Sequence, residues 1–371
     1  MAHLSVVQLL PELNSGGVER GTLEIARELV KYGHRSVVIS AGGRLVPKLL
    51  QEGSEHLAWP LGVKSPLALR WVLPLRRWLH EQHIDIVHAR SRLPAWIAWL
   101  AWRTMSPASR PRFITTVHGL YSVSRYSAIM HSGERVIAVS ETVRNYLQQH
   151  YPKAAPERIQ VIQRGVDPNI FPYNHEPSTE WWAHWYAQYP QLRHVSVLTL
   201  PGRLSRLKGH EDFIALMARL RAQQLPVKGL IVGGVEPRRQ RYAQQLRHLV
   251  QEKGLESTII FTGHRTDMRE IYAMSTLVLS LSTKPESFGR SVLEALSVGT
   301  PVLGYDHGGV GEILRALYPA GLIDTGNRDA LVSRVRHVLS TLPPVPAKPA
   351  FPLQKMLDET LALYTALHQS P

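Results

Sequence analysis

The chain has 371 residues, of which 44% are hydrophobic and 19% charged, and this composition is typical of a folded globular protein with two or three domains. It contains no cysteine, which excludes disulfides, thiol nucleophiles and cysteine-ligated metal sites and fits a reducing compartment. The formal net charge of +14 favours phosphorylated substrates or an anionic membrane surface as partners, whereas neither zinc-finger spacing nor an RNP-like motif points to nucleic acid.

The N-terminus and the longest apolar stretches predict a cytoplasmic protein. The first ten residues carry no positively charged region before their short apolar run, so they predict a first strand and not a signal peptide. The apolar stretch Pro94–Trp102 is far shorter than the roughly 18 residues that a membrane span requires.

Short β-branched segments alternate with helical patterns through the first half of the chain, which predicts α/β layers built on a parallel sheet. A helical pattern follows the first strand and ends at Gly33, a suitable helix C-cap. The predicted strands are Leu4–Leu10, Ser36–Ser40, Asp85–Ala89, Arg112–His118 and Arg135–Ser140.

The second half repeats this alternation from about Val195 onward. Its predicted strands are Val195–Gly202, Lys228–Gly234, Thr258–His264, Thr276–Ser282 and Thr300–Asp306. Residues 167–190 between the halves are rich in proline, which places the domain junction near Pro172. We therefore expect an N-terminal domain at residues 1–172, a C-terminal domain at 173–352 and a final helix at 353–371 that packs back on the first domain.

Two doubly wound Rossmann-like domains bind ligands at the carboxyl ends of their strands, so we expect the site in a cleft that both sheets face. The loop Asn14–Gly21 follows the first strand, and its Gly16 and Gly17 allow the backbone to approach a ligand at a helix N-terminus. It matches neither GxGxxG nor a Walker motif, and a simple flexible turn explains it as well.

Two histidines lie at the ends of predicted strands of the first half. His118 ends one strand and precedes Gly119, where its imidazole could donate a hydrogen bond to a sugar hydroxyl or to the reacting centre. A lone histidine is more often structural, so this interpretation depends on the other clusters. Asp85 and His88 occupy similar strand-end positions, and the sequence indicates a site role for them less strongly than for His118.

The segment GRLSRLKG, Gly202–Gly209, follows a predicted strand and opens a helix. Arg203 offers a bidentate fork and Lys208 a mobile point charge, and together they could neutralise a pyrophosphate leaving group. Basic residues at such turns are usually only solvated, which is the alternative interpretation.

The segment Lys284–Gly309 contains two carboxylates eight residues apart, Glu286 at a helix entry and Glu294 two turns along a predicted helix over 288–298. Free backbone N–H groups near Phe288, Gly289 and Ser291 would suit a phosphate at that helix N-terminus. The carboxylates could accept hydrogen bonds from ribose or hexose hydroxyls. The alternative interpretation is structural: an acidic residue at the helix N-terminus interacts favourably with the helix dipole, and the other Glu is simply solvated.

Taken in order, these motifs resemble the retaining glycosyltransferases of family 4, which have the GT-B fold. The resemblance spans nearly the whole chain, and only the ordered set makes it specific. It rests on these segments: SGGVER, TVHG around His118, AVSE at Ala138–Glu141, GRLSRLKG as the GR-x-x-x-x-KG motif, ESFGRSVLE as the E-x7-E motif, and GGVGE at Gly308–Glu312. The chain departs from the family at Gln163–Asp167, where PNGVD is common, and at Gly311, where proline is common; both differences concern local loop contacts.

The resemblance implies a role for each matching residue. Arg203 and Lys208 would bind the donor diphosphate, Glu294 the ribose hydroxyls, and Glu286 with the backbone of Phe288 and Gly289 the donor hexose. Besides these, His118 would lie beside the reacting sugar and Gly17 would approach the diphosphate or the acceptor.

The predicted reaction transfers a hexose from a nucleotide diphosphate sugar, expected to be UDP-linked, to a glycan or glycolipid with retention of configuration. The donor is a substrate, and no cofactor is expected. No D-x-D motif occurs in the chain, so we expect Arg and Lys, and no metal ion, to stabilise the departing diphosphate. The alternatives are an inverting GT-B transferase, a nucleotide-sugar epimerase and a non-catalytic nucleotide-sugar-binding protein.

The acceptor side of the sequence suggests a membrane surface. Residues 1–172 hold 21 Lys and Arg against 12 acids, and Leu67–His83 mixes tryptophans and leucines with Arg70, Arg76 and Arg77. Helices packing on a sheet would explain the apolar positions equally well. Because Gly119–Ser140 also resembles enzymes of lipopolysaccharide core assembly, we expect a lipid-linked or anionic glycan acceptor and peripheral association with the inner face of the inner membrane.

Overall fold

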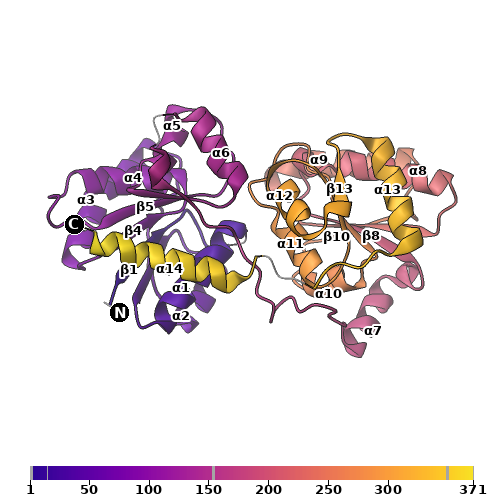
Figure 1. Ribbon diagram of the computed structural model, residues 1–371, viewed down its shortest axis with the longest axis horizontal. Helices are drawn as coiled ribbons and strands as arrows, with labels where there is room; N and C mark the ends of the chain where they lie inside the picture. Colours follow the sequence, from indigo (N-terminus) through magenta and orange to yellow (C-terminus); the bar gives the residue numbers. More distant parts are fainter. Residues whose placement is uncertain (1–2, 15, 153–154, 348–350, 371) are drawn as a thin grey trace. The chain divides into compact units, whose positions relative to one another are not determined.

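The computed structural model describes residues 3–14, 16–152, 155–347 and 351–370, which form two compact units (Figure 1). Unit 1 comprises Met1–Arg164 and Gln354–Pro371, and unit 2 comprises Gly165–Leu353. The chain passes from one unit to the other between Arg164 and Gly165, so the proline-rich stretch predicted to hold the junction belongs to unit 2. No helix within the described ranges is long and apolar enough to cross a bilayer.

Unit 1 is built on a seven-stranded parallel sheet with the strand order β3-β2-β1-β4-β5-β6-β7. Its strands are β1 (Ser5–Leu9), β2 (Arg35–Ser40), β3 (Glu55–Ala58), β4 (Ile86–Ala89), β5 (Arg112–Val117), β6 (Arg135–Ala138) and β7 (Ile159–Val161). The connecting helices are α1 (Gly17–Lys31), α2 (Val46–Gln51), η1 (Pro66–Trp71), α3 (Val72–Glu81), α4 (Arg92–Arg103), α5 (Arg125–Ala128), η2 (Ile129–His131), α6 (Glu141–His150) and η3 (Pro156–Arg158).

The final helix, α14 (Leu353–Gln369), lies along unit 1, as predicted (Figure 1). Its Tyr364 is buried, and the Tyr364 hydroxyl lies 2.6 Å from Nδ1 of His88 on β4. Near the start of α14, Gln354 donates a hydrogen bond of 2.8 Å to Glu28 of α1. The last residues of the chain therefore complete the first unit.

Unit 2 repeats the architecture with a six-stranded parallel sheet in the order β10-β9-β8-β11-β12-β13. Its strands are β8 (Ser196–Pro201), β9 (Val227–Val232), β10 (Ile259–Gly263), β11 (Leu277–Ser280), β12 (Val302–Tyr305) and β13 (Leu322–Ile323). Its helices are α7 (Thr179–Gln188), η4 (Pro190–Leu192), η5 (Arg206–Lys208), α8 (His210–Ala222), η6 (Pro237–Arg239), α9 (Gln240–Glu252), α10 (Met268–Met274), α11 (Arg290–Ser297), α12 (Gly308–Leu317), η7 (Pro319–Gly321) and α13 (Arg328–Thr341).

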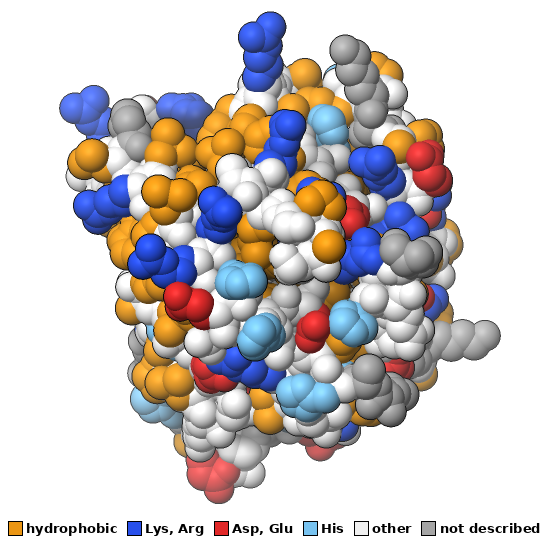
Figure 2. All heavy atoms as spheres, turned by 90° about the vertical axis from the view of Figure 1, so that its left-hand side faces the viewer, with side chains coloured by type: hydrophobic (Ala, Val, Ile, Leu, Met, Phe, Trp, Pro, Cys, Tyr) orange, Lys and Arg blue, Asp and Glu red, His pale blue; other side chains and the backbone are white. Residues whose placement is uncertain are grey.

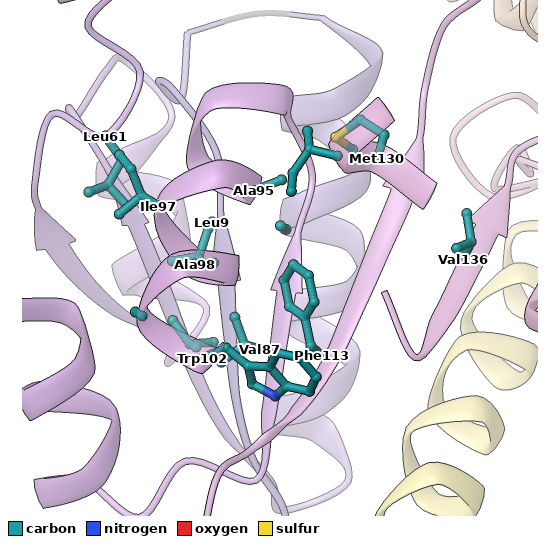
Figure 3. Close-up of a cluster of buried hydrophobic side chains, with 14 of the residues drawn as sticks. Leu9, Leu61, Val87, Ala95, Ile97, Ala98, Trp102, Phe113, Met130 and Val136 are labelled. Carbon is teal, nitrogen blue, oxygen red and sulfur yellow. The ribbon is translucent and has the colours of Figure 1, made fainter. Parts of the chain in front are cut away.

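Helices cover both faces of each sheet because successive strand residues point to opposite faces and both faces are apolar. On β2 of unit 1, Val37 and Ile39 pack in the cluster with α3 and α4, whereas Val38 packs with α1 and α2. Figure 3 shows the first of these clusters, where Phe113 of β5 and Val87 of β4 lie against Trp102 of α4. Unit 2 divides in the same way between one cluster with α8, α9 and α13 and others with α7, α10, α11 and α12.

Two proline-containing segments form helices in the structure. The proline-rich stretch at 167–190 contains the helix α7, which Ser178 begins by accepting a hydrogen bond of 3.2 Å from the Trp181 backbone N–H. The basic stretch Leu67–His83 divides into η1 and α3, so that Pro74 lies in the first turn of α3, where no intrahelical N–H bond is lost.

Candidate functional site

The strand order of unit 2 places a ligand-binding edge at the carboxyl ends of β8 and β11. These strands are neighbours, although β9 lies on the other side of β8, so the connections leave the sheet in opposite directions there. Such a switch point opens a crevice above the sheet in doubly wound folds. The loops that follow the two strands are Gly202–Gly209 and Leu281–Gly289, which carry the two predicted motifs.

Gly209 brings these two loops into contact. Its φ is +71°, a conformation that favours glycine, and a Cβ atom there would lie 1.8 Å from the carbonyl oxygen of Leu281. The loops are also joined by a hydrogen bond of 2.9 Å from the Thr283 N–H to the Leu207 carbonyl. Gly209 therefore permits the close approach of the two loops, and this approach positions Lys208, the residue before it.

Lys208 and Glu286 meet across this contact. The Lys208 Nζ lies 2.7 Å from the Glu286 Oε1, and the two side chains are 27% and 22% exposed. The Ser282 hydroxyl donates a hydrogen bond to the same carboxylate oxygen. The structure thus brings together one cation and one carboxylate that the sequence analysis selected from motifs 78 residues apart.

Electrostatics keep Glu286 ionised. Burial opposes its charge, but the positive charge and hydrogen bond of Lys208, the hydrogen bond from Ser282 and the charge of His307 outweigh burial, so the pKa of Glu286 lies below its ordinary value. The site therefore presents a carboxylate acceptor beside an ammonium group at neutral pH.

Two helices begin beside this ion pair, α11 after Gly289 and α12 at Gly308. The Gly309 N–H donates a hydrogen bond of 2.8 Å to the carbonyl of Glu286, and a Cβ at Gly309 would lie 2.3 Å from the Phe288 carbonyl oxygen. Phe288 is buried. Helix N-termini offer free N–H groups and positive dipole ends, which suit an anion.

Glu294 lies on α11, and its side chain is buried inside unit 2. Its carboxylate accepts a hydrogen bond of 3.2 Å from the Tyr272 hydroxyl and lies 3.1 Å from Nε of Arg290. Ser291 is half-buried in the first turn of the same helix. Glu294 is thus already oriented by two side chains that the sequence analysis did not identify.

Arg203 follows β8 on the same loop as Lys208, but its side chain does not join the cluster. It is 73% exposed and forms an ion pair with Glu236, which also accepts a hydrogen bond of 2.9 Å from Nε of Arg239. Of the two predicted diphosphate-binding cations, the structure therefore places only Lys208 beside Glu286.

Unit 1 contains the other predicted residues, some of them at the carboxyl edge of its own sheet. Gly16 precedes α1 with a φ of +146°, a conformation that favours glycine, and a Cβ at Gly17 would meet nothing within 4 Å. The N-terminus of α1 therefore has an open glycine at its first position. Asp85 precedes β4 and so lies at the amino edge, where it accepts a hydrogen bond of 2.7 Å from the Ser5 N–H. Asp85 therefore lies at the end of the strand opposite to the predicted site, because ligands bind at the carboxyl ends of the strands in this kind of fold.

His118 and His88 have different surroundings. His88 is completely buried, and its ring nitrogens lie 2.6 Å from the hydroxyls of Tyr364 and Thr116, which indicates a structural role. His118 directly follows β5 and is half-buried, and its Nδ1 lies 2.6 Å from Nη2 of Arg164. Burial and the charges of nearby arginines hold the pKa of His118 well below its ordinary value.

The sequence analysis missed several residues of these clusters. They are Ser282 and His307 beside Glu286, Tyr272 and Arg290 beside Glu294, and Arg164 beside His118. His307 follows a strand immediately before a glycine pair, the same signal that selected His118. Tyr272 and Arg164 are distant in sequence from their partners, Arg290 is an ordinary helix neighbour of Glu294, and Ser282 lies four residues before Glu286 in the same loop.

Comparisons with known proteins agree with this architecture. The pattern of the family described as Glycosyltransferase Family 4 matches residues 15–170, and that of Glycosyl transferases group 1 matches residues 194–344. The chain belongs to glycosyltransferase family 4. It is a glycosyltransferase with the GT-B fold.

Similar proteins come from several bacteria. The solved structure of a glycosyltransferase from Rickettsia africae is 28% identical, with a TM-score of 0.87 and full coverage of both chains. A structure of Anabaena HepE in complex with UDP and glucose is 22% identical, with a TM-score of 0.83 over 98% of this chain and all of that one. N-acetyl-alpha-D-glucosaminyl L-malate synthase of Bacillus anthracis is 23% identical over 89% of this chain and 85% of its own length.

The described residues contain no group of three or more His, Asp or Glu side chains arranged to hold a metal ion. In this glycosyltransferase Lys208 and the N-termini of α11 and α12 are positive groups beside Glu286.

Proposed function

We propose that this glycosyltransferase transfers a hexose from a UDP-linked donor to a glycan or glycolipid acceptor, with retention of anomeric configuration and without a metal ion. The observation that carries this proposal is the Lys208–Glu286 pair at the switch point of unit 2, with its nitrogen and oxygen 2.7 Å apart beside two helix N-termini. The complex of Anabaena HepE with UDP and glucose supports the choice of UDP.

The groups of unit 2 suit different parts of such a donor. The helix N-termini at Gly289 and Gly308 and the Lys208 ammonium can stabilise negative charge that develops on the diphosphate as the sugar bond breaks. Glu286 is ionised and can accept hydrogen bonds from hexose hydroxyls. Glu294, held by Arg290, can accept hydrogen bonds from ribose hydroxyls after a modest rearrangement of that pair.

The donor can be tested by thermal shift with UDP, GDP and ADP and their sugars, because a ligand that binds only the native state raises the melting temperature. We expect UDP and one UDP-hexose to stabilise the protein most. Turnover of that donor is then followed by NMR of the anomeric proton of the product, which should keep the configuration of the donor sugar.

Each alternative gives a different result in these assays. Inversion of the anomeric centre contradicts retention, and a changed sugar nucleotide released without an acceptor indicates an epimerase. Stabilisation by UDP without turnover of any sugar donor indicates a binding protein. Loss of turnover after removal of divalent cations with EDTA contradicts the proposed metal independence.

For the acceptor, we propose a lipid-linked or anionic glycan of lipopolysaccharide core or related cell-surface glycan synthesis, reached at an anionic membrane surface. The segment η1–α3 supports this because it exposes Leu67, Leu69 and Leu73 to between 53% and 69%. Exposed basic residues accompany them, namely Lys64, Arg70, Arg76 and Arg77, and no acid occurs between Glu55 and Glu81. Apolar side chains among cations fit the interface of an anionic bilayer.

The tryptophans of this region contribute less to the surface than the sequence suggests. Trp71 and Trp78 are half-buried and pack against Trp59, with ring centroids 5.2 Å and 6.2 Å apart. Figure 2 looks onto the end of unit 1 where α3 lies and shows apolar and basic side chains side by side over its upper part, with few acids among them. The exposed leucines, and not the tryptophans, would therefore enter the membrane.

Co-sedimentation with liposomes that contain phosphatidylglycerol tests this surface. We expect binding that weakens with added salt and is lost in the double variant Leu67→Ser/Leu73→Ser. Leu342→Ser is the matched control, because Leu342 is 60% exposed in unit 2. Equal binding of the double variant and the control would contradict the proposed surface.

A further inference from the structure

Arg164 is a buried charged group in contact with His118, a residue predicted to take part in the reaction. It is 8% exposed at the end of unit 1, and its guanidinium is enclosed by several elements. Its Nη1 lies 3.6 Å from the sulfur of Met356 on α14, and a Cβ at Gly21 of α1 would lie 2.1 Å from the same nitrogen. The absence of a side chain at Gly21 thus makes room for this arginine.

The chemistry of this contact fixes where the protons are. A guanidinium has only donor N–H groups and keeps its charge in proteins, so the Nη2 that lies 2.6 Å from Nδ1 of His118 must be the donor. Nδ1 must then present its lone pair. An imidazolium would place an N–H against an N–H at this distance, and a ring protonated on Nδ1 alone would do the same.

We propose that Arg164 is a positioning residue that locks His118 in the neutral tautomer with its proton on Nε2, so that His118 serves the transfer as a hydrogen-bond donor and not as a general base. The part of this inference that concerns the reaction rests on the proposed function. The tautomer itself does not.

The surroundings of His118 favour the same state. Besides Arg164, the charged and titratable groups that act on the ring are Arg90 and His88, and the Tyr121 hydroxyl interacts with the His118 backbone. Arg90 is 1% exposed and donates a hydrogen bond of 2.9 Å to Gln8. Burial and then the charges of Arg164, Arg90 and His88 lower the pKa of His118, so protonation of the ring meets buried positive charge.

A neutral ring with Nε2–H determines what His118 can do for a sugar substrate. It can donate one hydrogen bond to a hydroxyl of the donor sugar or to an oxygen that gains negative charge, which orients the reacting centre. It has no lone pair on Nε2 to accept the proton of the acceptor hydroxyl. That proton must therefore go elsewhere, for instance to an oxygen of the leaving diphosphate.

NMR of the protein labelled with ¹⁵N at histidine tests the tautomer without any substrate. The chain has 18 histidines, and the His118 signals are those that disappear in His118→Gln. We expect the pattern of a proton on Nε2 only, unchanged from pH 8 to pH 5, whereas an ordinary histidine titrates near pH 6.5. A proton on Nδ1, or protonation near pH 6.5, overturns the proposal.

Substitutions separate positioning from a merely structural role. Arg164→Met keeps an apolar stem, and we expect His118 to become a mixture of tautomers with a pKa nearer to its ordinary value. Arg164→Lys restores a donor-only group and should restore the Nε2–H form. Arg90→Met is the matched control, because it removes a buried cation that donates to Gln8 and should leave the tautomer unchanged.

The outcomes are distinct. An unchanged tautomer in folded Arg164→Met, or loss of the tautomer in folded Arg164→Lys, overturns the role of Arg164; if Arg164→Met does not fold, the wild type and Arg164→Lys decide. In activity assays we expect Arg164→Met to lower kcat at least tenfold with a small change in the KM of the donor, and to introduce a loss of rate below about pH 6.5. Failure of every donor to react contradicts the proposed function and leaves the NMR result unaffected.

Discussion

Removing the charge of Lys208 should change both catalysis and the pH dependence of stability. The substitution Lys208→Met keeps most of the side-chain volume and removes the cation that lies 2.7 Å from Glu286. Glu286 would then stay largely buried with the hydrogen bond of Ser282 but without the attraction that offsets its burial. We therefore expect the pKa of Glu286 to rise in the variant.

The size of the effect follows from the contact. Two unit charges about 4 Å apart attract by roughly 4 kcal/mol at an effective dielectric constant of about 20. Desolvation cancels part of this, and both side chains are about a quarter exposed. A hydrogen bond to a charged group contributes about 1.5–3 kcal/mol net, so we expect Lys208→Met to lower the free energy of unfolding by about 2 kcal/mol at pH 7. For a unit of this size that corresponds to roughly 4–8 °C in melting temperature.

The sign of the pH dependence is fixed by the direction of the pKa shift. Glu286 has a lowered pKa in the folded protein, so its stabilisation is present above the ordinary carboxylate pKa of about 4.3 and is lost as the pH falls through its folded value. The difference in unfolding free energy between wild type and Lys208→Met should thus be largest at pH 7 and shrink below about pH 4. Turnover should fall by about 10² or more, because a preorganised positive charge at the leaving group is removed.

Denaturant unfolding at several pH values and donor turnover check this prediction together. Lys253→Met is the matched control, because it makes the same charge change at an exposed position after α9. A pH-independent stability difference would refute the electrostatic coupling of Lys208 to Glu286. Near-wild-type turnover would refute the role of Lys208 in stabilising the leaving group.

Three further substitutions give separate expectations. Arg203→Ala should lower turnover by about 10² while changing the melting temperature little, because the exposed pair with Glu236 contributes only about 0–1 kcal/mol to stability; unchanged turnover would remove Arg203 from the donor site. Glu294→Gln should raise the Kd of the nucleotide measured by calorimetry about tenfold, since the buried amide loses charge-assisted hydrogen bonds; equal affinity would contradict ribose binding. Gly209→Ala should lower the free energy of unfolding by roughly 2–4 kcal/mol in urea titrations, because a Cβ would lie 1.8 Å from a carbonyl oxygen; a stable variant would show that the two loops can separate.

The sequence was most informative about the central strands. All ten predicted strands correspond to strands of the two sheets, because buried parallel strands are continuous β-branched runs. The three missed strands, β3, β7 and β13, all lie at sheet edges. β3 is only half-buried or exposed and β13 has two residues, so neither carries the apolar run on which the prediction depends.

For the site, the sequence identified residues next to glycines at strand ends but not their partners. Lys208 and Glu286 each stand in a loop whose spacing of glycines and helix starts is visible locally. Arg164 is 46 residues from His118, and Tyr272 is 22 residues from Glu294, so only the folded sheet brings each pair together. Partner choice of this kind is a property of strand order, which the local pattern does not contain.

Arg203 is a residue that its motif predicts for the donor site but whose side chain lies away from Lys208 in the structure. Its side chain bonds Glu236, 33 residues away, in a pair whose arginine is 73% exposed. Exposed pairs of this kind contribute about 0–1 kcal/mol, whereas a bidentate contact with a diphosphate joins a fork of N–H groups to a doubly charged anion. The free energy needed to break the Arg203–Glu236 pair is therefore small, and a diphosphate bound beside Lys208 could bind Arg203 in place of Glu236. The proposed donor site therefore requires a side-chain movement at Arg203 but no change in the fold of unit 2.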